Sequence, residues 1–226
     1  MRTAAVLPVK RFVRAKQRLG ASVAEQTRLA LAAAMVADVL DALGRTPAIA
    51  RTFVITNESA VAEPALELGA MVVADLPERG QSAAAALGVS RAVREGFERV
   101  LCVPGDCPSL DPHELEELLA TPTTGAEVVI VPDRHGTGTN GLLLQPPGVI
   151  EPSFGPDSCA RHSALATAAG VSWRLERPRS LLLDIDTGAD LAVLSERLGA
   201  SSLRAERTRA VLARAGSPEG ALSVPA

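Results

Sequence analysis

The stretch Arg99-Val-Leu-Cys-Val-Pro-Gly-Asp106-Cys-Pro108 decides how this sequence is expected to fold. Its apolar run, residues 100–103, predicts a buried strand, and the Pro-Gly pair that follows ends that strand. The Asp106 carboxylate therefore projects from the carboxyl end of a strand, which is where open α/β sheets bind their ligands. Taken alone, such an aspartate is more simply interpreted as the cap of the next helix.

A second stretch, Leu181-Leu-Leu-Asp184-Ile-Asp186, has the same character. We interpret residues 181–184 as another apolar strand, and the spacing of two residues puts Asp184 and Asp186 on one side of an extended segment. Three carboxylates on two strand ends suit a hard divalent cation such as Mg²⁺ and, through it, a phosphate substrate. The sequence therefore predicts a metal site formed by Asp106, Asp184 and Asp186.

Strand-like runs alternate with helical patterns along most of the 226 residues. A first strand at residues 3–9 precedes a helix at residues 22–43, for which Ser22 and Glu25 form a predicted capping box. Thr187 and Asp190 form a similar cap at a later helix. Residues 140–144 are expected to run antiparallel, because no helix links them to the preceding strand, and Trp173 is expected in the core. The alternation predicts a single-domain, three-layer, Rossmann-like α/β fold with a mostly parallel sheet, covering residues 1–215, and a flexible tail at residues 216–226.

Composition narrows the classes of protein to which the chain can belong. The net charge is −3 and there is no long basic block, so nucleic acid is not an expected partner. No stretch approaches the roughly 18 to 20 apolar residues of a membrane span. Three cysteines cannot all pair, which favours reduced thiols in a cytoplasmic protein. The sequence leaves a homodimer open.

A basic loop follows the first strand. It carries five cations within nine positions, among them Lys10, Lys16 and Arg18, and it lacks the glycines of a Walker loop or a G-x-G-x-x-G turn. Lysine acts on phosphate as a mobile point charge and arginine as a bidentate fork, so the loop suits a phosphate chain. A merely solvated basic loop is the alternative.

Two loops of small residues are candidate anion sites. Residues 136–140 read Gly-Thr-Gly-Thr139-Asn, and residues 154–158 read Phe-Gly155-Pro-Asp-Ser158 ahead of a predicted helix. Backbone amides in such turns and at helix starts attract phosphate or carboxylate, although ordinary turns look the same. Cys159 and His162 share a predicted helical face, but no third residue orients the pair, so a thiol–imidazole nucleophile is disfavoured.

In order along the chain, these segments resemble the 2-phospho-L-lactate/phosphoenolpyruvate guanylyltransferase family of deazaflavin coenzyme biosynthesis. The resemblance spans roughly residues 3 to 198, and its specific elements are Gly-Thr-Gly-Thr139 and Phe-Gly-Pro-Asp-Ser158. Gly105-Asp106-Cys-Pro108 is shared with many nucleotidyltransferases of this fold. The remaining matches are Pro8-Val-Lys10, Ala15-Lys16-Gln-Arg18-Leu19, Asp133-Arg-His135 and Asp184-Ile-Asp186-Thr-Gly-Ala-Asp190-Leu191.

The resemblance implies that an acceptor phosphate attacks the α-phosphorus of GTP and that pyrophosphate leaves. The acceptor would be phosphoenolpyruvate or 2-phospho-L-lactate, with the composition favouring the former. Asp106, Asp184 and Asp186 would hold Mg²⁺. Asp106 and Lys16 would be the catalytic pair. The GTP phosphates would meet Lys10, Lys16 and Arg18, and the acid would bind Thr139, Gly155 and Ser158.

One motif departs from the pattern of related nucleotidyltransferases. Gly80-Gln81-Ser82 stands where they usually show Gly-Leu-Asn, so Gly80 and Ser82 are assigned to the nucleotide by position alone. Two other functions stay open on the sequence. A different nucleotidyltransferase would use a sugar-phosphate or molybdenum-cofactor acceptor, and a non-catalytic module would bind a nucleotide without turnover.

Overall fold

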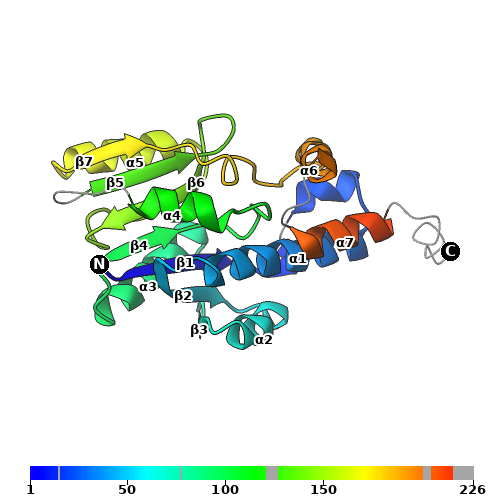
Figure 1. Ribbon diagram of the computed structural model, residues 1–226, viewed down its shortest axis with the longest axis horizontal. Coiled ribbons are helices and arrows are strands. Elements are labelled where there is room, and N and C mark those ends of the chain that lie inside the picture. Colours follow the sequence, from blue (N-terminus) through cyan, green and yellow to red (C-terminus); the bar gives the residue numbers. More distant parts are fainter. Residues whose placement is uncertain (15, 77, 121–126, 201–204, 216–226) are drawn as a thin grey trace.

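The computed structural model describes residues 1–14, 16–76, 78–120, 127–200 and 205–215. Seven strands form one sheet in the order β3-β2-β1-β4-β6-β5-β7 (Figure 1). Strand β6 is antiparallel to β4 and β5, as the missing helix predicts, and every other pairing is parallel. The strands are β1 (Thr3–Val9), β2 (Ile49–Thr56), β3 (Met71–Val73), β4 (Arg99–Cys102), β5 (Glu127–Pro132), β6 (Thr139–Gln145) and β7 (Ser172–Leu175).

Helices connect most of these strands and cover both faces of the sheet. Their bounds are η1 (Phe12–Arg14), η2 (Gln17–Ala21), α1 (Glu25–Gly44), α2 (Ser59–Glu67), α3 (Gln81–Arg94), α4 (Pro112–Ala120), α5 (Ser158–Ala168), α6 (Gly188–Ala200) and α7 (Glu206–Ala215). The mostly parallel α/β sheet confirms the predicted fold class. The domain limits at residues 1–215 stay a prediction, and the predicted tail lies outside the described residues.

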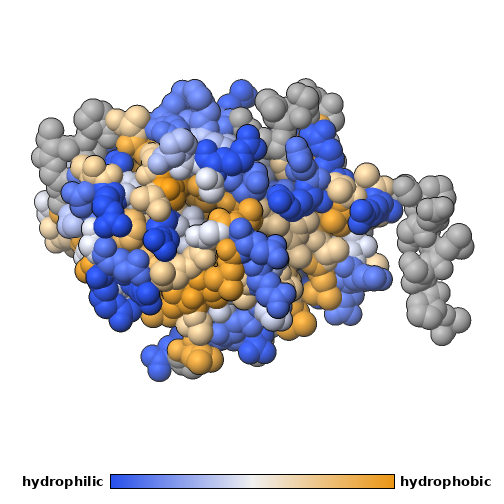
Figure 2. All heavy atoms as spheres, turned by 60° about the horizontal axis from the view of Figure 1, so that its bottom comes forward, coloured by the Kyte–Doolittle hydropathy of each residue, from blue (hydrophilic) through white to orange (hydrophobic). Residues whose placement is uncertain are grey.

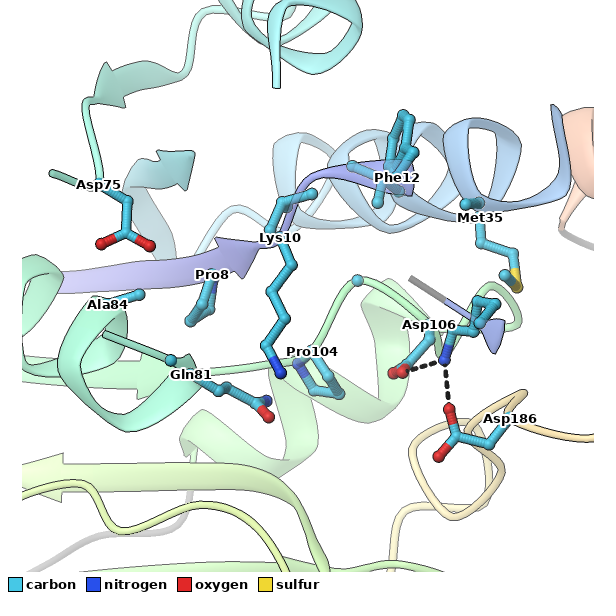
Figure 3. A pocket seen from close by; sticks show the side chains of 16 residues that line it. Pro8, Lys10, Phe12, Met35, Asp75, Gln81, Ala84, Pro104, Asp106 and Asp186 are labelled. Carbon is cyan, nitrogen blue, oxygen red and sulfur yellow. Dashed lines mark hydrogen bonds and ion pairs between the residues drawn. The ribbon is translucent and has the colours of Figure 1, made fainter. Parts of the chain in front are cut away.

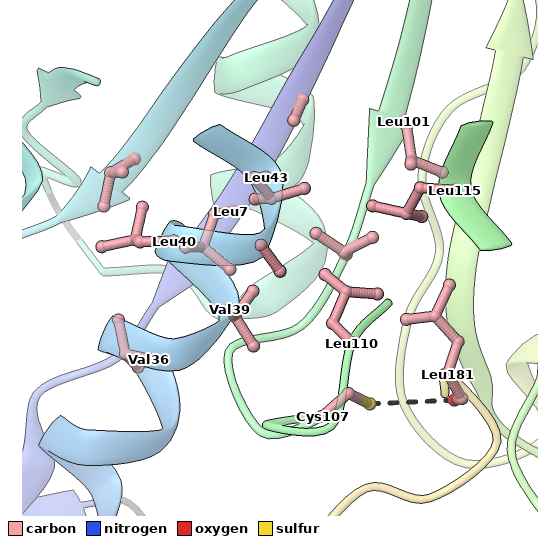
Figure 4. Close-up of a cluster of buried hydrophobic side chains, with 14 of the residues drawn as sticks. Leu7, Val36, Val39, Leu40, Leu43, Leu101, Cys107, Leu110, Leu115 and Leu181 are labelled. Atoms are coloured by element: carbon pink, nitrogen blue, oxygen red, sulfur yellow. Dashed lines mark hydrogen bonds between the residues drawn. The ribbon is translucent and has the colours of Figure 1, made fainter. Parts of the chain in front are cut away.

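Alternation along the central strands builds two separate cores. On β1, Ala5 and Leu7 face the layer formed by α1, α2 and α4, whereas Ala4 and Val6 face α3 and α5. Figure 4 shows part of the first core, in which Leu40 and Leu43 of α1 lie beside Leu7 of β1, and Leu115 of α4 lies beside Leu101 of β4. Both faces of the sheet are therefore buried, which explains why its strands read as continuous apolar runs.

Helices α6 and α7 lie beyond the carboxyl ends of the parallel strands, beside the first half of α1 (Figure 1). The buried Asp38 carboxylate of α1 accepts hydrogen bonds from the Thr208 backbone N–H at 2.9 Å and hydroxyl at 2.7 Å, so α1 caps α7. The predicted cap of α6 is confirmed: Asp190 N–H donates to Thr187 Oγ1 at 3.3 Å, and Thr187 N–H donates back to the Asp190 carboxylate at 2.7 Å. These contacts fix α6 and α7 beyond the carboxyl edge of the sheet.

Three local predictions are wrong. Residues 181–184 are not a strand: Leu181 and Leu183 are buried, but the nearby Ile185 N–H donates to the Asp106 carbonyl oxygen at 3.0 Å and not to a neighbouring strand. Ser22 and Glu25 do not cap α1, because Ser22 ends η2 and lies against the start of α6. Trp173 is exposed, because β7 is an edge strand. The indole N–H of Trp173 donates a hydrogen bond to Thr167.

Gly88 brings α3 into close contact with the sheet. A Cβ atom there would lie 2.4 Å from Val6 Cγ1, so Gly88→Ala forces the helix away from β1. Alanine gains about 1 kcal/mol in helix propensity, but overpacking costs about 1–3 kcal/mol. We expect a lower melting temperature by calorimetry. Gly44→Ala, at the end of α1 with nothing within 4 Å, is the control and is expected to be neutral or stabilising. A stabilised Gly88→Ala variant would contradict this packing.

The surface mixes apolar and hydrophilic side chains. Figure 2 shows one face, on which a continuous apolar area is bordered by hydrophilic residues. The exposed large apolar side chains include Leu66, Leu68 and Leu76. Within the described part of the chain, no helix combines the length and the apolarity that crossing a membrane needs. The three cysteines are unpaired and buried.

Candidate active site

The turn after β4 delivers Asp106 to the edge of the sheet. Val103 N–H still bonds the Val6 carbonyl of β1 at 3.0 Å, and the chain then turns at Pro104-Gly105. A Cβ atom on Gly105 would lie 2.8 Å from Val36 of α1, so only glycine passes under that helix without a shift. The side chain of Asp106 is mostly buried, and its Oδ1 atom has no hydrogen-bond partner among the described residues.

Lys16 of the basic loop joins two of the predicted carboxylates. Its Nζ atom donates to Asp106 Oδ2 at 2.5 Å and to Asp186 Oδ1 at 2.6 Å, and only 9% of the side chain is exposed (Figure 3). Burial alone lowers the pKa of Lys16, but the Asp106 and Asp186 carboxylates outweigh it and raise the pKa above its ordinary value. Lys16 is therefore a fixed positive charge at neutral pH.

The backbone at Lys16 is left-handed, with φ 55° and ψ 33°. A non-glycine residue in this region costs of order 1 kcal/mol, and the two ion pairs offset that cost. The conformation aims the side chain from the loop back over the sheet edge.

Asp184 lies close enough to the other two carboxylates to feel their charge. Burial raises the pKa of Asp184, and the nearby Asp106 and, to a smaller extent, Asp186 raise it further. Asn140 holds it in place, since Asn140 Nδ2 donates to Asp184 Oδ1 at 3.1 Å and to the Leu181 carbonyl at 2.8 Å. Sequence reasoning missed this role of Asn140, although it placed the residue in a candidate anion loop.

The three predicted metal ligands thus converge from two segments, with the Lys16 ammonium between two of them. Among the described residues, no group of three His, Cys, Asp or Glu side chains is already arranged to hold a metal ion. The chemistry of the donors nevertheless fits a divalent cation. Within the described part of the chain, Asp106 Oδ1 is a buried carboxylate oxygen without a partner, and no cationic side chain forms an ion pair with Asp184.

A pocket opens beside this cluster. Figure 3 shows Lys10 and Gln81 pointing into it near Asp106 and Asp186. Gly80, with φ 102°, begins α3 at its rim, and glycine is needed for that conformation. Lys10, Lys16 and Gly80, which the sequence assigns to the nucleotide, line this pocket, and their role in binding stays a prediction. Arg18 is exposed and outside the lining.

Ser82 also lies outside the lining and connects two loops. Its hydroxyl accepts a hydrogen bond from Phe154 N–H at 2.8 Å, so the start of α3 is tied to the loop that precedes α5. This loop contains Gly155, whose φ of 111° needs glycine, and it ends at Ser158, the first residue of α5. Thr139 and Ser158 are both buried.

His162 links the two predicted acceptor loops. Its ring is fully buried, Nε2 accepts from Ser153 N–H at 2.8 Å, and Nδ1 lies 3.0 Å from Thr139 Oγ1. Since Nε2 is the acceptor, the neutral ring carries its proton on Nδ1 and donates it to Thr139. Burial and then the Arg161 charge lower the pKa of His162 to about 4. With both nitrogens engaged, His162 is a positioning residue and not a base for Cys159.

The family is shown by sequence comparison. Residues 3–197 match the family described as "Guanylyl transferase CofC like". A phosphoenolpyruvate guanylyltransferase from Conexibacter woesei is 47% identical over 213 residues, which cover 94% of this chain and 96% of that protein. The chain belongs to the CofC-like guanylyl transferase family. The predicted family and the predicted class of enzyme, a nucleotidyltransferase, are thereby confirmed.

Two further comparisons concern the acceptors named for relatives and the fold. A 3-phospho-D-glycerate guanylyltransferase from Phenylobacterium zucineum is 36% identical over 190 residues, covering 82% of this CofC-like chain and 86% of that protein. The solved structure of a nucleotidyl transferase from Methanothermobacter thermautotroptrophicus superposes with a TM-score of 0.64 at 20% identity, covering 88% of this chain and 99% of that one. The latter likeness shows the fold alone.

Proposed function

We propose that this protein transfers GMP from GTP to the phosphate of phosphoenolpyruvate, with release of pyrophosphate, as a step in deazaflavin coenzyme biosynthesis. The observation that carries the proposal is the convergence of Lys16, Asp106 and Asp186 beside a pocket at the carboxyl edge of the sheet. It occurs in a chain of the guanylyl transferase family, 47% identical to a relative named for this activity.

Asp106, Asp184 and Asp186 would hold Mg²⁺ in this proposal. A bound divalent cation neutralises charge on a triphosphate and aligns the attacking oxygen with phosphorus. The partnerless Oδ1 of Asp106 and the uncompensated charge on Asp184 support this assignment. Asn140 would keep Asp184 oriented while the ligand is exchanged.

The side chains of the protein supply positioning and charge. Lys16 and Lys10 line the pocket, where their ammonium groups would hold the triphosphate and stabilise the leaving pyrophosphate. An acceptor phosphate oxygen forms the new bond to the α-phosphorus as the bond to pyrophosphate breaks. That oxygen is already ionised at neutral pH, since the second pKa of a phosphate monoester is about 6, so no general base is needed.

The proposal also names which phosphorylated acid accepts the GMP group. The relatives named above use different three-carbon acids, phosphoenolpyruvate in one case and 3-phospho-D-glycerate in the other. Purified protein should be incubated with GTP and, separately, phosphoenolpyruvate, 2-phospho-L-lactate and 3-phospho-D-glycerate, and pyrophosphate release should be followed. We expect the highest kcat/KM with phosphoenolpyruvate. A higher value with either other acid would change the acceptor, and release with none of them would refute guanylyl transfer to this class.

His162 offers a test of the acceptor pocket. His162→Gln keeps an acceptor for Ser153 N–H but loses the donor to Thr139, whereas His162→Asn places a donor near Thr139 and loses the other bond. If Thr139 binds the acceptor, His162→Gln should raise the acceptor KM about three- to tenfold, the cost of one hydrogen bond, with the GTP KM unchanged. His162→Asn should raise it less.

Both His162 variants are to be compared in melting temperature and in the two KM values. An equal rise of the acceptor and GTP KM in both variants would show a general structural role instead.

We further propose a cytoplasmic location. The three unpaired, buried thiols support it, because cysteines persist as thiols in reducing compartments. Small anions are the proposed partners, and a homodimer remains open.

A further inference from the structure

A second cavity adjoins the pocket beside Lys16 and Asp106. Each cavity has a volume of about 260 Å³. They share Val9, Lys10, Asp75 and Gly80, and the second is lined in addition by Arg11, Asn57 and Glu78. A nucleotide whose phosphates lie at Lys16 can extend its nucleoside along this continuous hollow, so the second cavity offers a place for the base.

The hydrogen-bonding groups of this cavity are almost all engaged within the protein. Arg11 Nε donates to Glu78 Oε1 at 2.7 Å. The Asn57 side-chain amide holds the backbone of Asp75 at two points: it accepts from Asp75 N–H at 3.1 Å and donates to the Asp75 carbonyl at 2.5 Å. Asp75 is thus fixed through its backbone, and its side chain is left to the cavity.

Among the described lining residues, the Asp75 carboxylate and the Lys10 ammonium are the exceptions. Among the residues that the structure describes, no side chain or backbone group donates a hydrogen bond to the Asp75 carboxylate, and Figure 3 shows it turned into the pocket. Partial burial and then the nearby Glu78 charge raise the pKa of Asp75. A neutral ligand that brings two N–H donors would satisfy the hydrogen-bonding capacity of the Asp75 carboxylate, whereas another anion would be repelled by its charge.

We propose that the Asp75 carboxylate selects the guanine base by accepting hydrogen bonds from its N1–H and its 2-amino group. This inference rests on the proposed function, since it takes a nucleoside triphosphate as the occupant of the pocket. Guanine presents two adjacent N–H donors along one edge, which match the two oxygens of a carboxylate. Adenine and cytosine place an acceptor nitrogen beside their amino group, and uracil has one N–H between two carbonyls. Each of these edges leaves the carboxylate facing at least one lone pair.

Nucleotide analogues test the assignment without any mutation. ITP lacks only the 2-amino group, and XTP carries an oxygen in its place. With wild-type protein and phosphoenolpyruvate, we expect kcat/KM for ITP to be at least tenfold below that for GTP, since one charge-assisted hydrogen bond is lost. We expect XTP to be poorer still, because its oxygen faces the carboxylate. Equal use of GTP and ITP would overturn the assignment.

The variant Asp75→Asn tests the assignment through an expected gain of activity with XTP. An amide at this position offers one acceptor for N1–H and one donor for the 2-oxygen of xanthine, so the preference should invert. We expect kcat/KM to fall at least tenfold with GTP and to rise at least tenfold with XTP. Glu78→Gln is the matched control, because it removes a charge from the same cavity, and its GTP-to-XTP ratio should stay that of the wild type. The melting temperature of Asp75→Asn should be unchanged, because no described group bonds the carboxylate.

The outcomes separate this inference from the proposed function. If Asp75→Asn loses activity with GTP without gaining activity with XTP, or keeps the wild-type ratio of kcat/KM for GTP to that for XTP, base selection by Asp75 is refuted. Guanylyl transfer by the wild type would still stand. A shift of the ratio in Glu78→Gln equal to that in Asp75→Asn would show a general charge effect and would also overturn it. Absence of turnover by the wild type with GTP and every acceptor would instead refute the proposed function.

Discussion

Replacement of Asp106 by asparagine is expected to lower turnover by at least a hundredfold and to leave the fold intact. The proposed reaction brings two anions together, so it depends on a cation held at the carboxylates, and a neutral amide at position 106 removes one charged ligand of that cation. Asp186→Asn should behave in the same way. Folding should survive because each variant also relieves repulsion among three neighbouring carboxylates.

The measurements are steady-state turnover with Mg²⁺, turnover in excess chelator, and the melting temperature. Asp41→Asn on the exposed side of α1, paired there with Arg45, is the matched control and should keep full activity. Full activity of either site variant, or of the wild type in chelator, would remove the metal assignment.

Lys16→Ala is expected to weaken GTP binding at least tenfold, a loss of about 1.4 kcal/mol, and to lower turnover as well. The variant removes a buried ammonium that lies between two carboxylates, so their negative charge would then face the triphosphate without compensation. Calorimetric titration with GTP measures the loss directly. Arg45→Ala, which removes an exposed cation from an ion pair on α1, is the control. An unchanged GTP affinity together with weaker acceptor binding would show that the two subsites are reversed.

The fold could be predicted because both faces of its sheet are buried. Strands β1 and β4 are short apolar runs, and Pro104-Gly105 follows closely after β4. The missing helix before β6 correctly indicated an antiparallel strand. The same signal failed at residues 181–184. Burial makes a segment apolar whether or not it pairs with a strand, so composition cannot tell a buried irregular segment from a β-strand.

The chemistry of the site could be predicted in part. The carboxylates and Lys16 were recognised from residue type and position, but not the ion pairs between them, which join residues 90 and 170 positions apart. Nothing in the sequence indicated that Asn140 orients Asp184, or that Asp75 has the base-selecting role that we propose for it. Asn140 is a single polar residue at the start of β6, and Asp75 is one in the loop after β3. The role of each depends on which segment the fold brings opposite to it.

The central claim is that the α-phosphate of GTP ends on the acceptor. GTP labelled in the α-phosphate should be incubated with the protein, Mg²⁺ and phosphoenolpyruvate, and the labelled products separated and identified by mass. The account predicts that the label moves, in step with pyrophosphate release, into a guanosine diphosphate ester of the acid, with none formed when the acid is omitted. Label recovered as free GMP, or left in GTP, in the presence of the three candidate acids would contradict it.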